Sequence, residues 1–133
     1  MKNHPRLEYG VTSVGNRAID EKGISRAIKI GIKRLLSRLS AKPKMILLDG
    51  SLFAPSEYPQ KTIIRGDEKI PIIAAASIIA KVTRDRKMVR LAKKFPEYGF
   101  HIHKGYGTKL HCKLVKKYGL CDIHRRSFCS RLV

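Results

Sequence analysis

Residues 65–86 read RGDEKIPIIAAASIIAKVTRDR, and this stretch decides the fold prediction. An acidic residue, Asp67, precedes an apolar run over residues 70–80 that becomes basic as it ends. Pro71 suits the first turn of a helix, and the run is apolar on every side, so the sequence predicts a buried helix. A membrane-spanning helix needs about 20 apolar residues, which favours the core of a soluble protein.

Two short apolar runs before this helix predict strands. They are MILL (45–48), ending at Asp49, and KTII (61–64), ending just before Asp67. Further upstream, residues 7–14 alternate imperfectly and predict another strand, and residues 16–40 show the period of one amphipathic helix. Asp20 and Glu21 suit the start of that helix. The alternation of strands and helices predicts an α/β fold in a single domain over residues 1–133.

The remaining signals for the ends of helices lie in the C-terminal half. Pro96 and Gly99 should end the long helix, and Thr108 is placed to cap a last helix that closes at Gly119. The three cysteines are odd in number and form no CxxC pair, and the N-terminus has no apolar signal core. Both features are typical of a cytoplasmic protein with reduced thiols.

The charge balance points to a polyanionic partner. The chain has 29 Lys and Arg against 10 Asp and Glu, a formal net charge of +19, and from Lys81 onward the numbers are 15 and 3. One interpretation of this charge is simply a well-solvated, highly soluble surface. So large an excess repels itself unless a partner neutralises it, so we favour nucleic acid.

Asp49 and Asp67 each follow a short strand. If the strands are neighbours, both carboxylates emerge at one rim of the sheet, where ligand sites of α/β folds collect. A hard cation such as Mg²⁺ or Mn²⁺ would relieve their repulsion. The alternative is that Asp-Gly is simply a turn after each strand.

Two further patterns are weaker. Histidines and cysteines gather after residue 100, but none of the usual zinc spacings occurs, so we expect surface or phosphate-facing histidines and small buried thiols. The segment HKGYGT (103–108) has glycines that let the backbone approach a ligand, with Lys104 for a phosphate and Tyr106 for stacking. Alone, a Gly-flanked Tyr is equally typical of a turn.

Long segments of the chain, in this order, resemble the ribonuclease HII family. They are AIDEKGISRAI (18–28), LLDG (47–50), IPIIAAASIIAKVTRDRKM (70–88), FPEYGFHIHKGYGT (95–108) and HRRSF (124–128). The resemblance implies a ribonuclease H-like fold and an endonuclease that cleaves RNA in RNA–DNA hybrids and at ribonucleotides embedded in DNA, by two-metal hydrolysis with Mg²⁺ or Mn²⁺.

The resemblance also assigns residues. Of the family's four carboxylates, Asp49 matches the third and Asp67 the fourth, and Tyr106 matches the tyrosine that helps to sense the ribonucleotide–deoxyribonucleotide junction. The nucleic-acid-binding motifs contain Lys81, Arg84, His103, Lys104, Arg125 and Arg126. Asp20 and Glu21 match a helix-start motif, so they are not assigned to the site. For Asp85 we expect an ion pair with Arg84 or Arg86, or a place on a helix face, rather than catalysis.

One departure shapes the expectations. The family's DE-x-GRG segment, which supplies the first two carboxylates on the central first strand, does not occur in this sequence. We therefore expect an N-terminally truncated fold whose exposed sheet edges favour association, and weak or no activity of the chain alone. The alternatives are a non-catalytic relative that binds nucleic acid and a small ribosome-associated basic protein.

Overall fold

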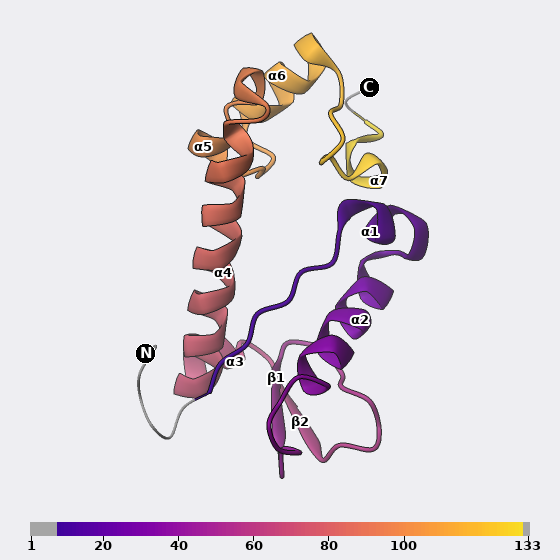
Figure 1. Ribbon diagram of the computed structural model, residues 1–133, viewed down its shortest axis with the longest axis vertical. Helices are drawn as coiled ribbons and strands as arrows, with labels where there is room; N and C mark the ends of the chain where they lie inside the picture. Colours follow the sequence, from indigo (N-terminus) through magenta and orange to yellow (C-terminus); the bar gives the residue numbers. More distant parts are fainter. Residues whose placement is uncertain (1–7, 132–133) are drawn as a thin grey trace.

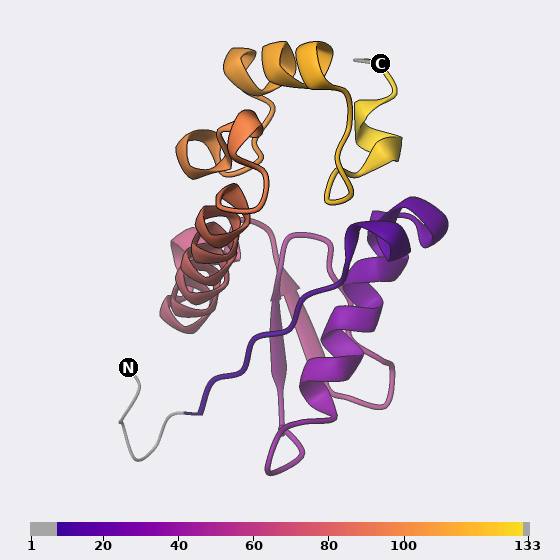
Figure 2. The same ribbon diagram turned by 45° about the horizontal axis from the view of Figure 1, so that its top comes forward.

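The computed structural model describes residues 8–131 as a mixed α/β chain dominated by helices (Figure 1). The elements in chain order are α1 (Asn16–Lys22), α2 (Ile24–Leu36), β1 (Ile46–Asp49), β2 (Gln60–Ile63), α3 (Gly66–Lys69), α4 (Pro71–Ala92), the 3₁₀ helix η1 (Pro96–Tyr98), α5 (Phe100–His103), α6 (Lys109–Tyr118) and α7 (Arg126–Cys129). Helix α4 connects the strands and α2 to the C-terminal helices, and α7 returns beside α1 (Figures 1 and 2). The two helices α1 and α7 are therefore neighbours in space although they lie at opposite ends of the sequence.

The two strands lie within one residue of their predicted bounds, and they pair in parallel. Their register runs from Ile46 opposite Gln60 to Asp49 opposite Ile63. The loop that joins them is fixed by the Gln60 side chain, whose Oε1 accepts from the Ala54 backbone N–H at 2.8 Å and whose Nε2 donates to the Ala54 carbonyl at 3.1 Å. The pair of strands thus places both strand ends at one edge.

The N-terminal predictions need two corrections. Residues 8–15 form no strand, and Leu7 lies outside the described residues. This segment packs along α2 instead: a Cβ added at Gly31 would lie 3.7 Å from side-chain atoms of Thr12 and Val14. The single helix expected over residues 16–40 is two helices, because Gly23 has a φ of 78° and breaks the hydrogen-bond ladder between them.

The prediction that the apolar half of α4 is buried was wrong. Ile72 and Ile78 are 53% and 59% exposed, and of the helix residues Ile73 and Ala92 are buried. The helix packs mainly through its ends, against α3 and β1 at its start and against α5 at its end. An apolar sequence shows that a helix can be buried, but burial needs a covering layer, and the middle of α4 has little within residues 8–131.

The best-packed core lies at the C-terminal end of α4. Ala92, Tyr98 and Phe100 form its centre, with Met88, Phe95, Cys121 and Ile123 packed around them. The rings of Tyr98 and Phe100 stack at 5.5 Å. Thr108 caps α6 as predicted, accepting from the His111 N–H at 3.2 Å, and Gly119 closes that helix. No helix among the described residues is long and apolar enough to cross a membrane.

Candidate metal and nucleic-acid site

One hydrogen bond links Asp49 to the buried residue Gly66, which directly precedes Asp67 in the chain. Asp49 ends β1, and its Oδ1 accepts a hydrogen bond from the backbone N–H of Gly66 at 2.7 Å. A Cβ on Gly66 would lie 2.8 Å from Ile73 Cδ1, so no larger residue fits without a shift. Asp67 follows directly and is exposed in the first turn of α3. The two strands are neighbours, which is the condition under which the sequence predicts a shared rim.

The turn into α3 is held by Arg65. This residue has a φ of 56°, in the left-handed region that non-glycine residues rarely adopt. Its guanidinium donates from Nε and Nη2 to Glu68 Oε1 at 2.9 and 2.8 Å. Glu68 is thus paired with Arg65, whereas Asp49 ends β1 and Asp67 lies in the first turn of α3.

These two carboxylates fit a hard cation in part. Mg²⁺ and Mn²⁺ accept oxygen ligands, and Mg²⁺ is commonly bound through one or two carboxylates with water and phosphate completing the shell. Asp49 Oδ1 accepts the hydrogen bond from the Gly66 N–H, which fixes the carboxylate, and Oδ2 is the oxygen left to bind a metal ion. Within residues 8–131 no group of three or more His, Cys, Asp or Glu side chains could hold a metal ion. The described donors therefore suit one ion rather than a complete two-metal set.

Three histidines form a buried hydrogen-bonded stack rather than a zinc site. The rings of His103 and His111 stack at 4.2 Å, and His111 Nε2 lies 3.1 Å from His124 Nε2. His111 Nδ1 pairs with the Tyr106 carbonyl, and His124 Nδ1 accepts from the Cys121 N–H. Burial lowers the pKa of both His111 and His124 below the usual value. Neutral rings satisfy every one of these bonds.

The expectation of surface histidines was therefore wrong for these three, which are 6–8% exposed. The reason is tertiary: the ring of Phe100 packs edge-on against His103 and His111, and this removes water from the cluster. The cysteines are half-buried and free, and burial raises the pKa of the Cys121 and Cys129 thiols.

The HKGYGT loop is built on this stack. His103 Nδ1 accepts from the Gly105 N–H at 3.1 Å, and its Nε2 lies 2.7 Å from the Tyr98 carbonyl. Lys104 and Gly105 both have positive φ, at 50° and 76°, so the chain turns sharply before Tyr106. A Cβ on Gly105 would lie 3.1 Å from Met88 Cε, which shows how closely the loop approaches α4.

Tyr106 is presented at the surface beside a cation. Its side chain is half exposed, and the Arg84 guanidinium carbon lies 4.5 Å from the ring centroid. Arg84 also pairs with Asp85 at 3.4 Å, which is one of the alternatives expected for Asp85. A shallow groove of about 740 Å³ runs along α4 to the loop. It is lined by Val82, Thr83, Asp85, Arg86, Val89, Arg90 and Lys104.

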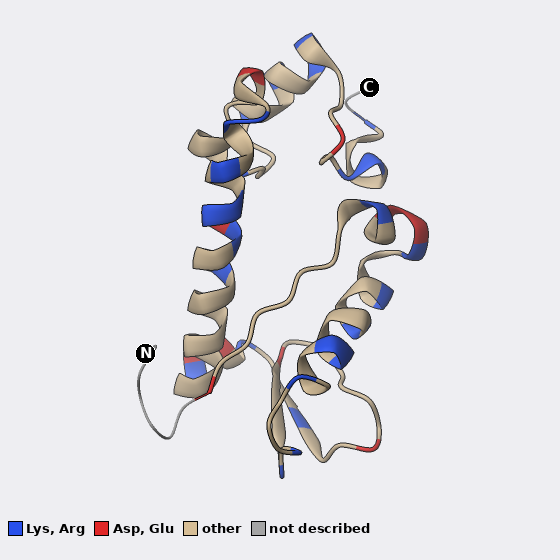
Figure 3. Ribbon diagram, in the orientation of Figure 1, with Lys and Arg blue, Asp and Glu red and all other residues tan. Residues whose placement is uncertain are grey.

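Basic residues extend beyond this groove. Figure 3 shows them along α2, on the C-terminal half of α4 and near α7. Lys81 is exposed on α4, and Arg126 is exposed at the start of α7. The Arg125 guanidinium lies 4.0 Å above the ring of Phe128, which restricts its direction. The predicted cations therefore sit on two structural units, α4 with its loop and the C-terminal segment, defined here as residues 121–129.

Sequence reasoning missed what holds the C-terminal segment. Asn16 Nδ2 donates to the carbonyls of Asp122 and His124 at 2.7 and 2.9 Å. Asp20 accepts from the backbone N–H groups of Arg126 and Ser127 at 2.9 and 3.0 Å and from the Ser127 hydroxyl at 2.5 Å. Asp20 lies near the end of α1, not at a helix start as expected. The i, i+4 spacing of Asn16 and Asp20 was the available signal, but it names no partner.

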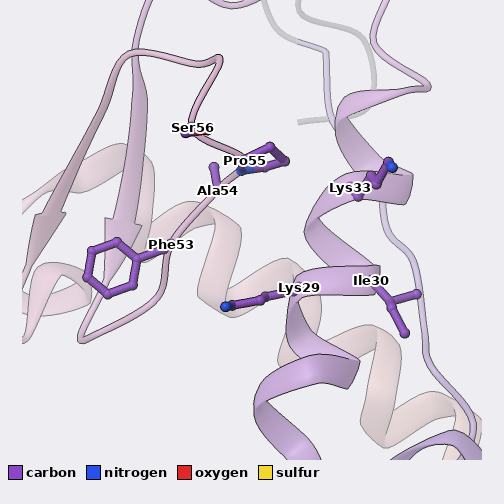
Figure 4. A pocket seen from close by; sticks show the side chains of 7 residues that line it. All are labelled: Lys29, Ile30, Lys33, Phe53, Ala54, Pro55 and Ser56. Carbon is purple, nitrogen blue, oxygen red and sulfur yellow. The ribbon is translucent and has the colours of Figure 1, made fainter. Parts of the chain in front are cut away.

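A separate cavity of about 390 Å³ lies between α2 and the loop after β1 (Figure 4). Lys29 and Lys33, one helical turn apart, line it together with Phe53, Ala54 and Pro55, and the Lys29 side chain points toward that loop. Ile30 and Ser56 complete the lining. These residues include no carboxylate, imidazole or thiol, and the charged side chains among them are those of Lys29 and Lys33.

The Ribonuclease HII family profile matches residues 3–131. The chain belongs to the ribonuclease HII family. It is 42% identical over 127 residues to a ribonuclease HII of Caldicellulosiruptor saccharolyticus, covering 96% of this chain and 62% of that relative. A Coxiella burnetii ribonuclease HII is 44% identical over 120 residues, covering 90% and 59%.

The solved ribonuclease H2 from Pyrococcus horikoshii OT3 has a similar structure. It superposes with a TM-score of 0.67 at 27% identity, over 90% of this chain and 65% of that one. The predicted α/β, ribonuclease H-like fold class is thus confirmed. This chain spans about 60% of the length of the ribonuclease HII relatives above. The strand ends and the basic segments of the site all lie inside the matched region.

Proposed function

We propose that this chain provides part of a ribonuclease HII-type endonuclease site, acting on RNA in RNA–DNA hybrids and on ribonucleotides embedded in DNA. The observation that supports the proposal is the hydrogen bond from the Gly66 N–H to Asp49, which holds the residue before Asp67 against the end of β1. It occurs in a ribonuclease HII family member with a net charge of +19. Such a charge attracts the phosphates that this substrate class presents.

In this proposal Asp49 and Asp67 would hold Mg²⁺ or Mn²⁺. Such an ion, when bound, stabilises negative charge on a phosphodiester and lowers the pKa of a bound water. The protein's own contribution is to fix Asp49 through the Gly66 N–H and to keep Asp67 exposed to solvent and substrate. The two-metal mechanism of the resemblance needs ligands beyond these two.

The nucleic acid would lie across both basic units. Lys81, Arg84, Lys104, Arg125 and Arg126 would contact phosphates, and Tyr106 would stack on a sugar or base at the junction. His103 takes a different role from the predicted contact. Its ring is buried and both nitrogens are bonded, so it supports the turn that presents Tyr106.

We expect weak activity from these carboxylates alone. Asp20 and Glu21 are adjacent acids like the family's first two carboxylates. Asp20, however, accepts three hydrogen bonds from Arg126 and Ser127 and lies on α1, away from the strands (Figure 1). The alternative is a non-catalytic relative that binds hybrid duplexes. The lack of a three-ligand metal group among residues 8–131 favours that alternative.

A nicking assay separates the two. The purified chain is incubated with a DNA duplex that carries one ribonucleotide, in Mn²⁺ and in chelator, and Asp49→Asn is compared with Glu57→Gln. Glu57 is an exposed carboxylate in the loop that follows Asp49, so it matches the charge change. Metal-dependent nicking that disappears in Asp49→Asn and persists in Glu57→Gln supports the endonuclease. Binding without nicking, with enzyme in excess, supports the alternative.

A further inference from the structure

We infer that Asn16 and Asp20 of α1 are positioning residues that hold Arg125 and Arg126 in place for nucleic acid. The inference rests on the proposed function, because it assigns a purpose to the basic C-terminal segment of that same site. Neither residue is among the site residues that the family resemblance assigns.

The contacts form a two-point clamp of matched polarity. Asn16 contributes a donor and reaches two carbonyls, those of Asp122 and His124, which precede the arginines. Asp20 contributes an acceptor and reaches two N–H groups, those of Arg126 and Ser127. One turn of α1 separates the two side chains, so a single rigid helix face binds the chain on both sides of Arg125.

The acidic half of the clamp is charged. The hydrogen bond from the Ser127 hydroxyl, followed by the one from its backbone N–H, lowers the pKa of Asp20. An ionised carboxylate also suits the exposed N–H groups where α7 begins. Asp20 is therefore a stronger acceptor here than a neutral side chain of the same shape.

A second anchor holds the segment from the other side. His124 joins the buried histidine stack through His111, and its Nδ1 accepts from Cys121. The backbone around Arg125 is thus fixed by the stack at residue 124 and by Asp20 at residues 126 and 127. Stacking on Phe128 further restricts the Arg125 guanidinium. Cations that are already ordered lose less conformational freedom when they bind phosphate.

The consequence is specific to binding. Without the clamp, Arg125 and Arg126 keep their charges but lose a defined position, so contacts at the two phosphates weaken while contacts at α4 remain. The salt dependence of binding counts the neutralised phosphates, with a slope in log–log form of about 0.9 per phosphate for duplex DNA. Loss of the clamp should therefore lower that slope, which a uniform loss of folded protein would not do.

The test is a binding cycle with a fluorescent RNA–DNA hybrid, measured by anisotropy over a range of salt. Asp20→Ala is made in the parent chain and in the Arg125→Ala/Arg126→Ala background, and Asp20→Asn tests rescue by a side chain that keeps one acceptor. Glu21→Ala, an exposed acidic neighbour on α1, is the control for loss of one negative charge. Asn16→Ala repeats the cycle from the other half of the clamp.

The expected result is a loss of about tenfold in affinity for Asp20→Ala, with a salt slope lower by about 1 to 2. Asp20→Asn should fall between, Glu21→Ala should stay within about twofold, and in the arginine-free background Asp20→Ala should cost less than about twofold. Equal losses in both backgrounds, or an unchanged slope, would overturn the inference. If Asp20→Ala fails to fold, the Asn16→Ala cycle decides by the same criteria.

The outcome is independent of catalysis. The cycle measures binding alone, so a chain that binds hybrids without nicking them refutes the endonuclease and still decides this inference. A parent chain that binds no hybrid overturns the inference directly.

Discussion

Replacing Gly66 by Ala tests how tightly the strand ends are packed. The new Cβ would lie 2.8 Å from Ile73 Cδ1, closer than real Cβ atoms come, and 3.4 Å from both Asp49 Oδ1 and Ile63 Cβ. Gly66 and Ile73 are buried, so the strain cannot relax into solvent. Either Ile73 leaves its position in α4, or α3 moves away from Asp49 and lengthens the 2.7 Å hydrogen bond.

The magnitude follows from two opposing effects. Overpacking a buried site by one methyl costs about 1–3 kcal/mol. Alanine in place of glycine in a helix returns about 0.5–1 kcal/mol. From the middle of these two ranges we expect Gly66→Ala to lower the free energy of unfolding by about 1 kcal/mol, measured by urea denaturation followed by circular dichroism.

A second substitution identifies the clash. Ile73→Val removes Cδ1 itself and alone costs about 0.5–1.5 kcal/mol. In the double variant the clash is relieved, so the two losses should be less than additive by about 1 kcal/mol. Gly107→Ala is the matched control, since a Cβ there meets nothing within 4 Å. A Gly66→Ala chain as stable as the parent, or additive losses in the double variant, would refute the packing described for the strand ends.

Three further predictions concern the C-terminal half. Burial lowers the pKa of His111 and His124, so below about pH 6.5 the unfolded chain binds more protons than the folded chain. The free energy of unfolding should therefore fall as the pH decreases from about 7 to about 5. A flat profile in urea titrations would contradict the neutral stack. Tyr98→Phe removes a hydroxyl that donates to the Gly119 carbonyl at 3.1 Å and should cost about 1 kcal/mol of thermal or urea stability, and a neutral result would show that this bond contributes nothing net. Tyr106→Ala should weaken hybrid binding by about 1–3 kcal/mol by anisotropy while Tyr106→Phe stays close to the parent, and equal losses in both would argue against stacking.

Local sequence patterns predicted β1, which carries Asp49, and β2, which precedes Asp67, but not the short helix α3 on which Asp67 lies. Short apolar runs set the strands that end near Asp49 and before Asp67, Pro71 starts α4, and Thr108 caps α6. Each of these depends on a few neighbouring residues, through backbone propensity, a fixed φ or one capping hydrogen bond. Such features can be read from the sequence because their partners lie within a few positions.

Family resemblance extended this reading to Tyr106 and the basic motifs, but it could not say which side chains are exposed. His103 lies in a polar loop sequence, yet its ring is buried because Phe100 and His111 pack against it. Ile78 lies in the most apolar stretch, yet it is 59% exposed because little of the described chain covers the middle of α4.

The sequence by itself therefore determined the family, the positions of the two strands with Asp49 at the end of the first, and the positive charge that favours a nucleic-acid partner. The tertiary structure alone decided burial and the long-range contacts, above all the clamp in which Asn16 meets Asp122 across 106 positions of the chain. The physical reason is that helix and strand signals act over one or two turns of the backbone, whereas a hydrogen bond between distant segments exists only once the whole path of the chain has brought them together.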